Sequence, residues 1–134
     1  MSTGKGYWLA NKVLDATFGG VPFTTPAVIY MALYAVSPGA DGGGVEFAGG
    51  NYARVAVTND STSWSLSSQG QKISLRDITF PGASANLGTA VAAAFLDAPS
   101  GGNLLVWGTL QTATPIFAGQ IPIFPAGSIT LVEQ

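Results

Sequence analysis

Carboxylates are the side chains of this chain best suited to chemistry, because the sequence has no histidine and no cysteine. The seven are Asp15, Asp41, Glu46, Asp60, Asp77, Asp97 and Glu133. A Ser-His-Asp triad, a Cys-His pair, a disulfide and an imidazole or thiolate zinc site are therefore excluded. A glycosidase needs two facing carboxylates, and Asp77 and Asp97 lie at the edges of expected strands. Their spacing does not require them to face each other, and turn aspartates are common, so we expect no enzyme.

The segment from Asp41 to Glu46 has some likeness to a calcium-binding loop. An EF-hand loop places oxygen ligands at alternate positions and ends on a bidentate glutamate. Here glycines occupy the intermediate positions, and no Gly-Lys-Ser/Thr follows that would complete a phosphate-binding loop. The segment is predicted to be a flexible turn, with no metal, no cofactor and no small-molecule substrate.

The charge content points to a surface that is covered in the working state. The 134 residues include 5 Lys+Arg and 7 Asp+Glu, so 9% are charged, where a soluble domain usually has about 25%. Five basic residues do not make the positive stripe that nucleic acid requires. The longest apolar run, Ala27 to Val36, is shorter than the ~20 residues of a membrane-spanning helix, and the first residues do not resemble a signal peptide. Partner subunits are the remaining cover.

Residues 5–18 are the one good helix candidate. Ala10, Leu14 and Phe18 recur at helical spacing, and Tyr7 shares their face. Ser2 or Thr3 is expected to cap the start, and two glycines at 19 and 20 supply a left-handed stop.

After this helix, short β-branched and aromatic runs alternate with glycine and proline turns. The expected strands are Ala27–Val36, Tyr52–Thr58, Lys72–Leu75, Ile78–Phe80, Thr89–Leu96, Leu104–Leu110, Gln120–Phe124 and Ser128–Val132. Many short strands without intervening helices predict an antiparallel β-sandwich, jelly-roll-like, with one N-terminal α-helix. We expect one domain over residues 1–134, with residues 1–20 as an N-terminal arm and helix.

Two of these strands, Ala27–Val36 and Thr89–Leu96, are apolar on both faces. Strands of a small sandwich usually have one wet face. Either a neighbouring subunit covers the outer face, or both strands are central in a compact fold, and the pattern favours neither.

Five residues are the candidate contacts with other subunits: Tyr7, Trp8, Asp41, Glu46 and Trp64. Tyr7 and Trp8 lie near the chain end, where large aromatics are usually held against something. Asp41 and Glu46 lie in the glycine-rich loop over residues 39–50, and Trp64 lies in a polar stretch. Trp107 alternates with aliphatic residues and is expected in the core. The aromatic residues also allow a carbohydrate-binding module as an alternative.

The order of several short motifs resembles a family of small virion proteins of tailed bacteriophages. The motifs are Ala10-Asn11-Lys12, Leu14-Asp15, Ala32-Leu33, Asp41-Gly42, Gly50-Asn51-Tyr52-Ala53-Arg54, Ile78-Thr79-Phe80-Pro81, Gly88-Thr89-Ala90-Val91, Phe95-Leu96-Asp97-Ala98, Ser100-Gly101-Gly102-Asn103-Leu104-Leu105 and Gly108-Thr109-Leu110, with Ala126-Gly127 before the last strand. Members are often called phage tail fibre proteins, and some similar proteins decorate capsids.

The resemblance implies a structural protein without catalytic residues. We expect a capsid decoration (cement) protein, a homotrimer that binds the major capsid protein on the outer capsid surface of the virion. A tail or fibre-associated module is the alternative position. The chain lacks the long repetitive shaft of a fibre, which favours decoration.

Overall fold

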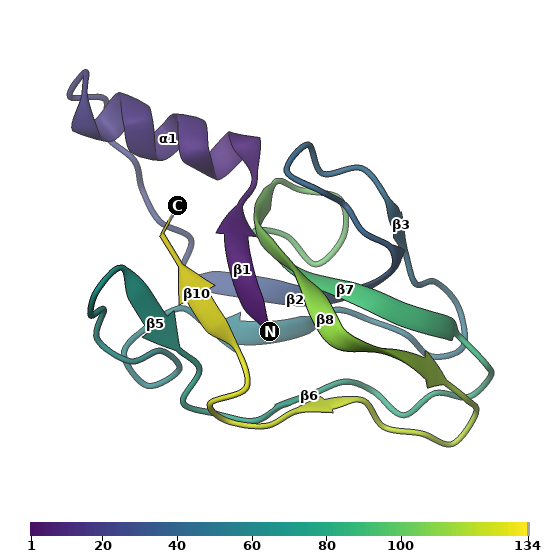
Figure 1. The fold of residues 1–134 in the computed structure, drawn as a ribbon. Helices are drawn as coiled ribbons and strands as arrows, with labels where there is room; N and C mark the ends of the chain where they lie inside the picture. The colour runs from purple at the N-terminus through teal and green to yellow at the C-terminus, as the bar shows by residue number, and fades with distance from the viewer. Residues whose placement is uncertain (134) are drawn as a thin grey trace.

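Three long strands form the centre of the computed structural model, which describes residues 1–133. They are β2 (Val28–Val36), β7 (Gly88–Leu96) and β8 (Leu104–Ile116), and they run antiparallel side by side (Figure 1). Two short strands, β3 (Val45–Glu46) and β4 (Val55–Thr58), share the other edge of β2. The β7–β8 turn is closed by Asp97, whose carboxylate accepts hydrogen bonds from the backbone N–H and side-chain amide of Asn103.

The sheet continues through the N-terminal strand β1 (Ser2–Lys5). Its second half pairs antiparallel with β8, and its first half pairs in parallel with β10 (Thr130–Val132), which in turn pairs with β5 (Gln71–Ile73). A separate ribbon joins β6 (Ile78–Thr79) to β9 (Ile123–Phe124). Gly108 permits the close approach of the β1 backbone to β8, because a Cβ at this position would overlap the carbonyl oxygen of Ser2.

The core lies between the central strands on one side and the β6–β9 ribbon with the segment before β10 on the other. This arrangement confirms the predicted β-sandwich with one N-terminal helix. Met31, Leu33 and Phe95 come from the central strands, and Phe80 and Ile129 come from the opposite layer. All five are buried, and β-branched, aromatic and long aliphatic side chains of this kind suit a pleated surface.

The outer face of β2 and β7 is also buried, by the chain itself. Its alanines, Ala32, Ala92 and Ala94, have no exposed surface and pack with Leu104 and the half-buried Trp107. The glycine-rich loop also approaches this cluster, because a Cβ on Gly42 would lie 3.6 Å from the Cβ of Leu104. The compact-fold alternative is therefore confirmed for these strands, and their apolar pattern does not require a neighbouring subunit.

The single helix, α1 (Tyr7–Thr17), is shorter than expected and starts differently. The predicted caps, Ser2 and Thr3, lie in β1, and the N-cap is Gly6, which has no side chain to cap with. The N–H of Tyr7 instead donates to the carbonyl of Ala40, 2.8 Å away in the glycine-rich loop. The predicted glycine stop is confirmed in part: Phe18 is the C-cap residue, and of the two glycines that follow it Gly20 is left-handed, with a φ of 66°.

Several expected bounds are wrong for identifiable reasons. No strand was expected at residues 2–5 of the N-terminal arm, but β1 forms there and pairs on both sides. The fourth strand starts at Val55 rather than at Tyr52, because Tyr52 closes a turn by donating its N–H to Gly49. Strand β8 runs six residues past Leu110, through Pro115. β1 pairs with only the first part of β8, so the later part of this edge tolerates a residue without an N–H.

Gly44 provides a test of this packing. It has a φ of +78°, and a Cβ there would lie 2.3 Å from the carbonyl oxygen of Val36. Gly49 is the matched control, because its φ is +72° and a Cβ would meet nothing within 4 Å. We expect Gly49→Ala to cost about 1 kcal/mol for the left-handed backbone, and Gly44→Ala to cost at least about 2 kcal/mol more. Urea unfolding measures both, and equal losses would contradict the close approach.

Candidate interaction surfaces

Two of the predicted contact regions lie side by side. Tyr7, at the start of α1, is 64% exposed, and its backbone is bonded to Ala40 in the glycine-rich loop. The neighbouring Asp41 is exposed, and its carboxylate accepts a hydrogen bond from the N–H of Gly43 at 3.0 Å. The structure therefore brings the ring of Tyr7 and the carboxylate of Asp41 to one end of the molecule, although 33 residues separate them in the sequence.

Trp8 is engaged within the chain. Its ring packs edge to face against Phe23, with ring centroids 5.9 Å apart, and the ammonium of Lys12 lies 5.5 Å from the ring centroid. The ring also packs against the core. Trp8 thus holds the segment that follows α1, and Tyr7 is the more accessible of the two aromatics.

Trp64 lies inside the protein, and the expectation that it reaches outside is wrong. It is 5% exposed and packs edge to face against Phe95 at 5.4 Å. Its polar neighbours misled the prediction: they form a turn around Asp60 that leads the ring inward. The prediction that Trp107 lies in the core is confirmed in part: the ring is half-buried and packs against a core cluster, but it also lines a surface groove. Trp64 is thereby removed from any surface platform that could bind carbohydrate.

Glu46 is used inside the fold. Its carboxylate accepts two hydrogen bonds from the guanidinium of Arg54, at 2.8 and 2.9 Å, and one from the Tyr52 hydroxyl at 2.6 Å. Arg54 also donates to the carbonyls of Ala98 and Gly101, both at 2.8 Å. This cluster joins strand β3, the start of β4 and the β7–β8 turn. It is a structural cluster, because the Arg54 side chain is only 7% exposed.

The electrostatics of this cluster follow from burial and hydrogen bonding. Burial opposes ionisation of Glu46, but the hydrogen bonds from Arg54 and Tyr52 outweigh it and hold the pKa of Glu46 below its ordinary value of 4.5. Burial, together with the bond to Glu46, raises the pKa of the Tyr52 hydroxyl. Burial also raises the pKa of Tyr34, which lies near the Glu46 carboxylate. Tyr34 and Tyr52 therefore stay neutral, and Glu46 and Arg54 form the ion pair of this cluster.

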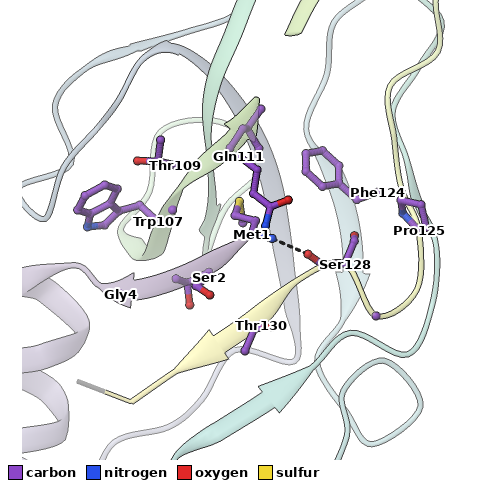
Figure 2. A pocket seen from close by; sticks show the side chains of 14 residues that line it. Met1, Ser2, Gly4, Trp107, Thr109, Gln111, Phe124, Pro125, Ser128 and Thr130 are labelled. Carbon is purple, nitrogen blue, oxygen red and sulfur yellow. Dashed lines mark hydrogen bonds between the residues drawn. The ribbon is translucent and has the colours of Figure 1, made fainter. Parts of the chain in front are cut away.

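A groove of about 880 Å³ lies beside the part of β8 that follows its pairing with β1. Figure 2 shows Met1 between Trp107, Thr109 and Gln111 of β8 on one side and the Phe124–Thr130 segment on the other. The amino group of Met1 donates to the carbonyl of Ser128 at 2.7 Å. The side chains that line the groove carry hydroxyl, amide and apolar groups and no charge.

Large apolar side chains are exposed at several places, and two sets of them lie close together in the sequence. The first, the α1 face, contains Tyr7, Leu14, Phe18 and Val21. The second, the β8–β9 end, contains Phe117, Ile121 and Ile123. Helical spacing in the sequence identifies Tyr7, Leu14 and Phe18 of the first set, whereas Val21 lies beyond α1. The second was missed because its residues are spread over a loop and a two-residue strand without a period.

The basic side chains leave no positive patch among residues 1–133. Lys5 pairs with Glu133, Lys12 lies over Trp8, Arg54 binds Glu46, and Lys72 and Arg76 donate to backbone carbonyls of Ser65 and Thr62. Over the same residues, no three His, Cys, Asp or Glu side chains gather as a metal site would require. No helix there has the length and apolarity to cross a membrane.

These features define a small β-sandwich protein whose accessible surface offers uncharged contacts. The sequence profile of the family described as "Podophage GP4 fiber I protein gp80" matches residues 4–132. The match spans nearly the whole chain, so the chain belongs to this family and is a structural protein of a bacteriophage virion. The resemblance to virion proteins of tailed phages is thereby confirmed. No curated protein matches the chain.

The importance of the Glu46–Arg54 cluster can be tested by removing the guanidinium. Arg54→Met leaves the Glu46 carboxylate half-buried without its cation and two carbonyls without donors. We expect a loss of about 3 kcal/mol in the free energy of unfolding, measured in urea at pH 7. Arg76→Met is the control, because Arg76 is exposed and makes one hydrogen bond; we expect a loss under about 0.5 kcal/mol. Similar losses for the two variants would contradict the assignment.

The same cluster predicts a pH dependence. Because the pKa of Glu46 is lower in the folded state than its ordinary 4.5, its stabilisation is complete above pH 4.5 and is lost as the pH falls through the folded value. Glu46→Gln removes this term. We therefore expect the stability difference between wild type and Glu46→Gln to be constant from pH 6 to 8 and to shrink in acid below pH 4.5. A difference that grows in acid would refute this.

Proposed function

We propose that this protein is a fibre-associated structural module of the phage virion, which binds neighbouring subunits through uncharged surfaces. The observation that carries the proposal is the pair of exposed apolar sets, the α1 face and the β8–β9 end. Soluble monomers rarely expose large contiguous apolar patches, and such patches usually mark protein contacts. Only 9% of the residues are charged, and the basic side chains are occupied within the chain.

The position on a fibre is supported by the description of the family, which names a fiber protein. The sequence alone favoured decoration of the outer capsid surface. The buried outer face of β2 and β7 weakens one argument for a decoration role, since those strands need no coat protein to cover them. A head decoration protein is therefore the second candidate, and the major capsid protein as partner and the homotrimer stay predictions.

Immunogold labelling of intact virions distinguishes the two positions. With antibodies raised against the purified protein, we expect few gold particles, gathered at the tail end. Many particles spread over the head would overturn the fibre position and support decoration. Virions from a phage deleted for the gene are the control for antibody specificity.

A further inference from the structure

A polar cleft lies between β4, with the turn that follows it, and the start of β6. It measures about 380 Å³, a size that suits a small ligand. It shares no residue with the α1 face or with the β8–β9 end. Its exposed side chains include Asp60, Thr62, Arg76 and Asp77. Three of these four are charged, in a chain in which only 9% of the residues are.

Each charged side chain of the cleft is held in place by the chain and keeps other atoms free. Oδ1 of Asp60 accepts hydrogen bonds from the N–H and the hydroxyl of Thr62, at 2.9 and 2.5 Å. Oδ1 of Asp77 accepts one from the N–H of Ala126 at 2.8 Å, and Nε of Arg76 donates to the carbonyl of Thr62 at 3.1 Å. The other carboxylate oxygens and the terminal guanidinium nitrogens make no hydrogen bond with residues 1–133. They are therefore positioned but available.

The charges of the cleft do not pair with one another. Within the described part of the chain, no guanidinium nitrogen of Arg76 lies within 4.0 Å of a carboxylate oxygen of Asp60 or Asp77. The hydrogen bonds from Thr62 hold the pKa of Asp60 below its ordinary value of 3.8, and the charge of Arg76 adds to this effect. Asp60 is therefore ionised at neutral pH and is a hydrogen-bond acceptor.

A buried hydroxyl also lines the cleft. Ser63 is 5% exposed, and its side chain makes no hydrogen bond with residues 1–133. Buried polar side chains nearly always have a hydrogen-bond partner. A ligand in the cleft is the partner that the position of Ser63 allows.

The two strands beside the cleft are too close for a third strand between them. Within residues 1–133, β4 pairs with β2 and β6 pairs with β9, so one edge of each strand is unpaired. Some Cα atoms of β4 lie within 8 Å of Cα atoms of β6, whereas an inserted strand would need about 9.5 Å, twice the strand spacing. The geometry therefore favours a small molecule over an extended polypeptide.

The chemistry of the lining selects the class of ligand. Two carboxylates against one guanidinium oppose an anion such as phosphate, and the guanidinium opposes a metal cation. A ligand that satisfies the whole set must be neutral, must donate to the carboxylates and must accept from the guanidinium. Adjacent hydroxyl groups on a sugar ring meet these requirements, because each hydroxyl is both a donor and an acceptor.

We propose that this cleft binds a neutral sugar, with Asp60 and Asp77 accepting hydrogen bonds from ring hydroxyls and Arg76 donating to one of them. The site goes beyond the proposed function, because it uses none of the apolar surface on which that function rests. No aromatic side chain lines the cleft, so stacking adds nothing, and the dissociation constant is expected in the millimolar range.

Titration of the ¹⁵N-labelled protein, followed by NMR, is the test. The probes are the methyl glycosides of glucose, galactose, mannose, rhamnose and N-acetylglucosamine, each up to about 50 mM, which exceeds a millimolar dissociation constant. We expect at least one to give saturable shifts of the backbone amides of residues 60–63 and 76–79. Tetrahydropyran-2-methanol, a similar ring without adjacent hydroxyls, should give none. No saturable shift with any glycoside, equal shifts with the control ring, or shifts with inorganic phosphate alone would overturn the proposal.

Variants then test the assigned residues. Arg76→Met should weaken binding at least about tenfold, as expected for a lost hydrogen bond to a charged group. Asp77→Asn should also weaken binding, and it keeps an oxygen for the N–H of Ala126. Asp15→Asn is the matched control, because Asp15 is an exposed aspartate outside the cleft, and its affinity should equal that of the wild type.

Unchanged affinity in Arg76→Met, or an equal loss in Asp15→Asn, would refute the site. Urea unfolding of each variant separates lost binding from lost folding. The outcome is independent of the fibre position, because gold labelling reports where the protein lies and the titration reports what the free protein binds.

Discussion

The ion pair between Glu46 and Arg54 is the constraint on which much of this fold depends. The five hydrogen bonds of the guanidinium and the Tyr52 hydroxyl join strand β3, the start of β4 and the β7–β8 turn. They add to the backbone bonds that hold the glycine-rich loop, which are the bond from Tyr7 to Ala40 and the pairing of β3 with β2. The cost of placing one arginine away from water is offset because every bond is charge-assisted and the geometry is bidentate.

That use of charge has a consequence for the surface. Each of the five basic side chains contacts a group within the chain, although Lys12 and Arg76 stay exposed. Apolar side chains are exposed on the α1 face and at the β8–β9 end, and the side chains that line the β8 groove are uncharged. Such a surface suits permanent neighbours in an assembled particle, where contacts are buried once and not exchanged.

The helix turns its most regular apolar face away from the core. Helical spacing of Ala10, Leu14 and Phe18 identifies an apolar face, and such a face normally packs on the core. Here the body is contacted by Trp8 and Leu9 instead, because β1 enters α1 already paired with β8 and β10, which sets the rotation of the helix. The periodic face is therefore left outside, where Tyr7, Leu14 and Phe18 are exposed.

The sequence by itself determined the fold class, the place of the helix and the central strands, and the absence of histidine and cysteine chemistry. Local patterns carry this information, since propensity and turn residues act over a few neighbours. Only the tertiary structure decided that β1 and β3 exist, that Trp64 is buried while Trp107 lines a groove, and that Glu46 binds Arg54. These outcomes depend on pairings between residues far apart in the chain, such as Thr3 with Leu131, and no local pattern encodes which distant partner covers a side chain.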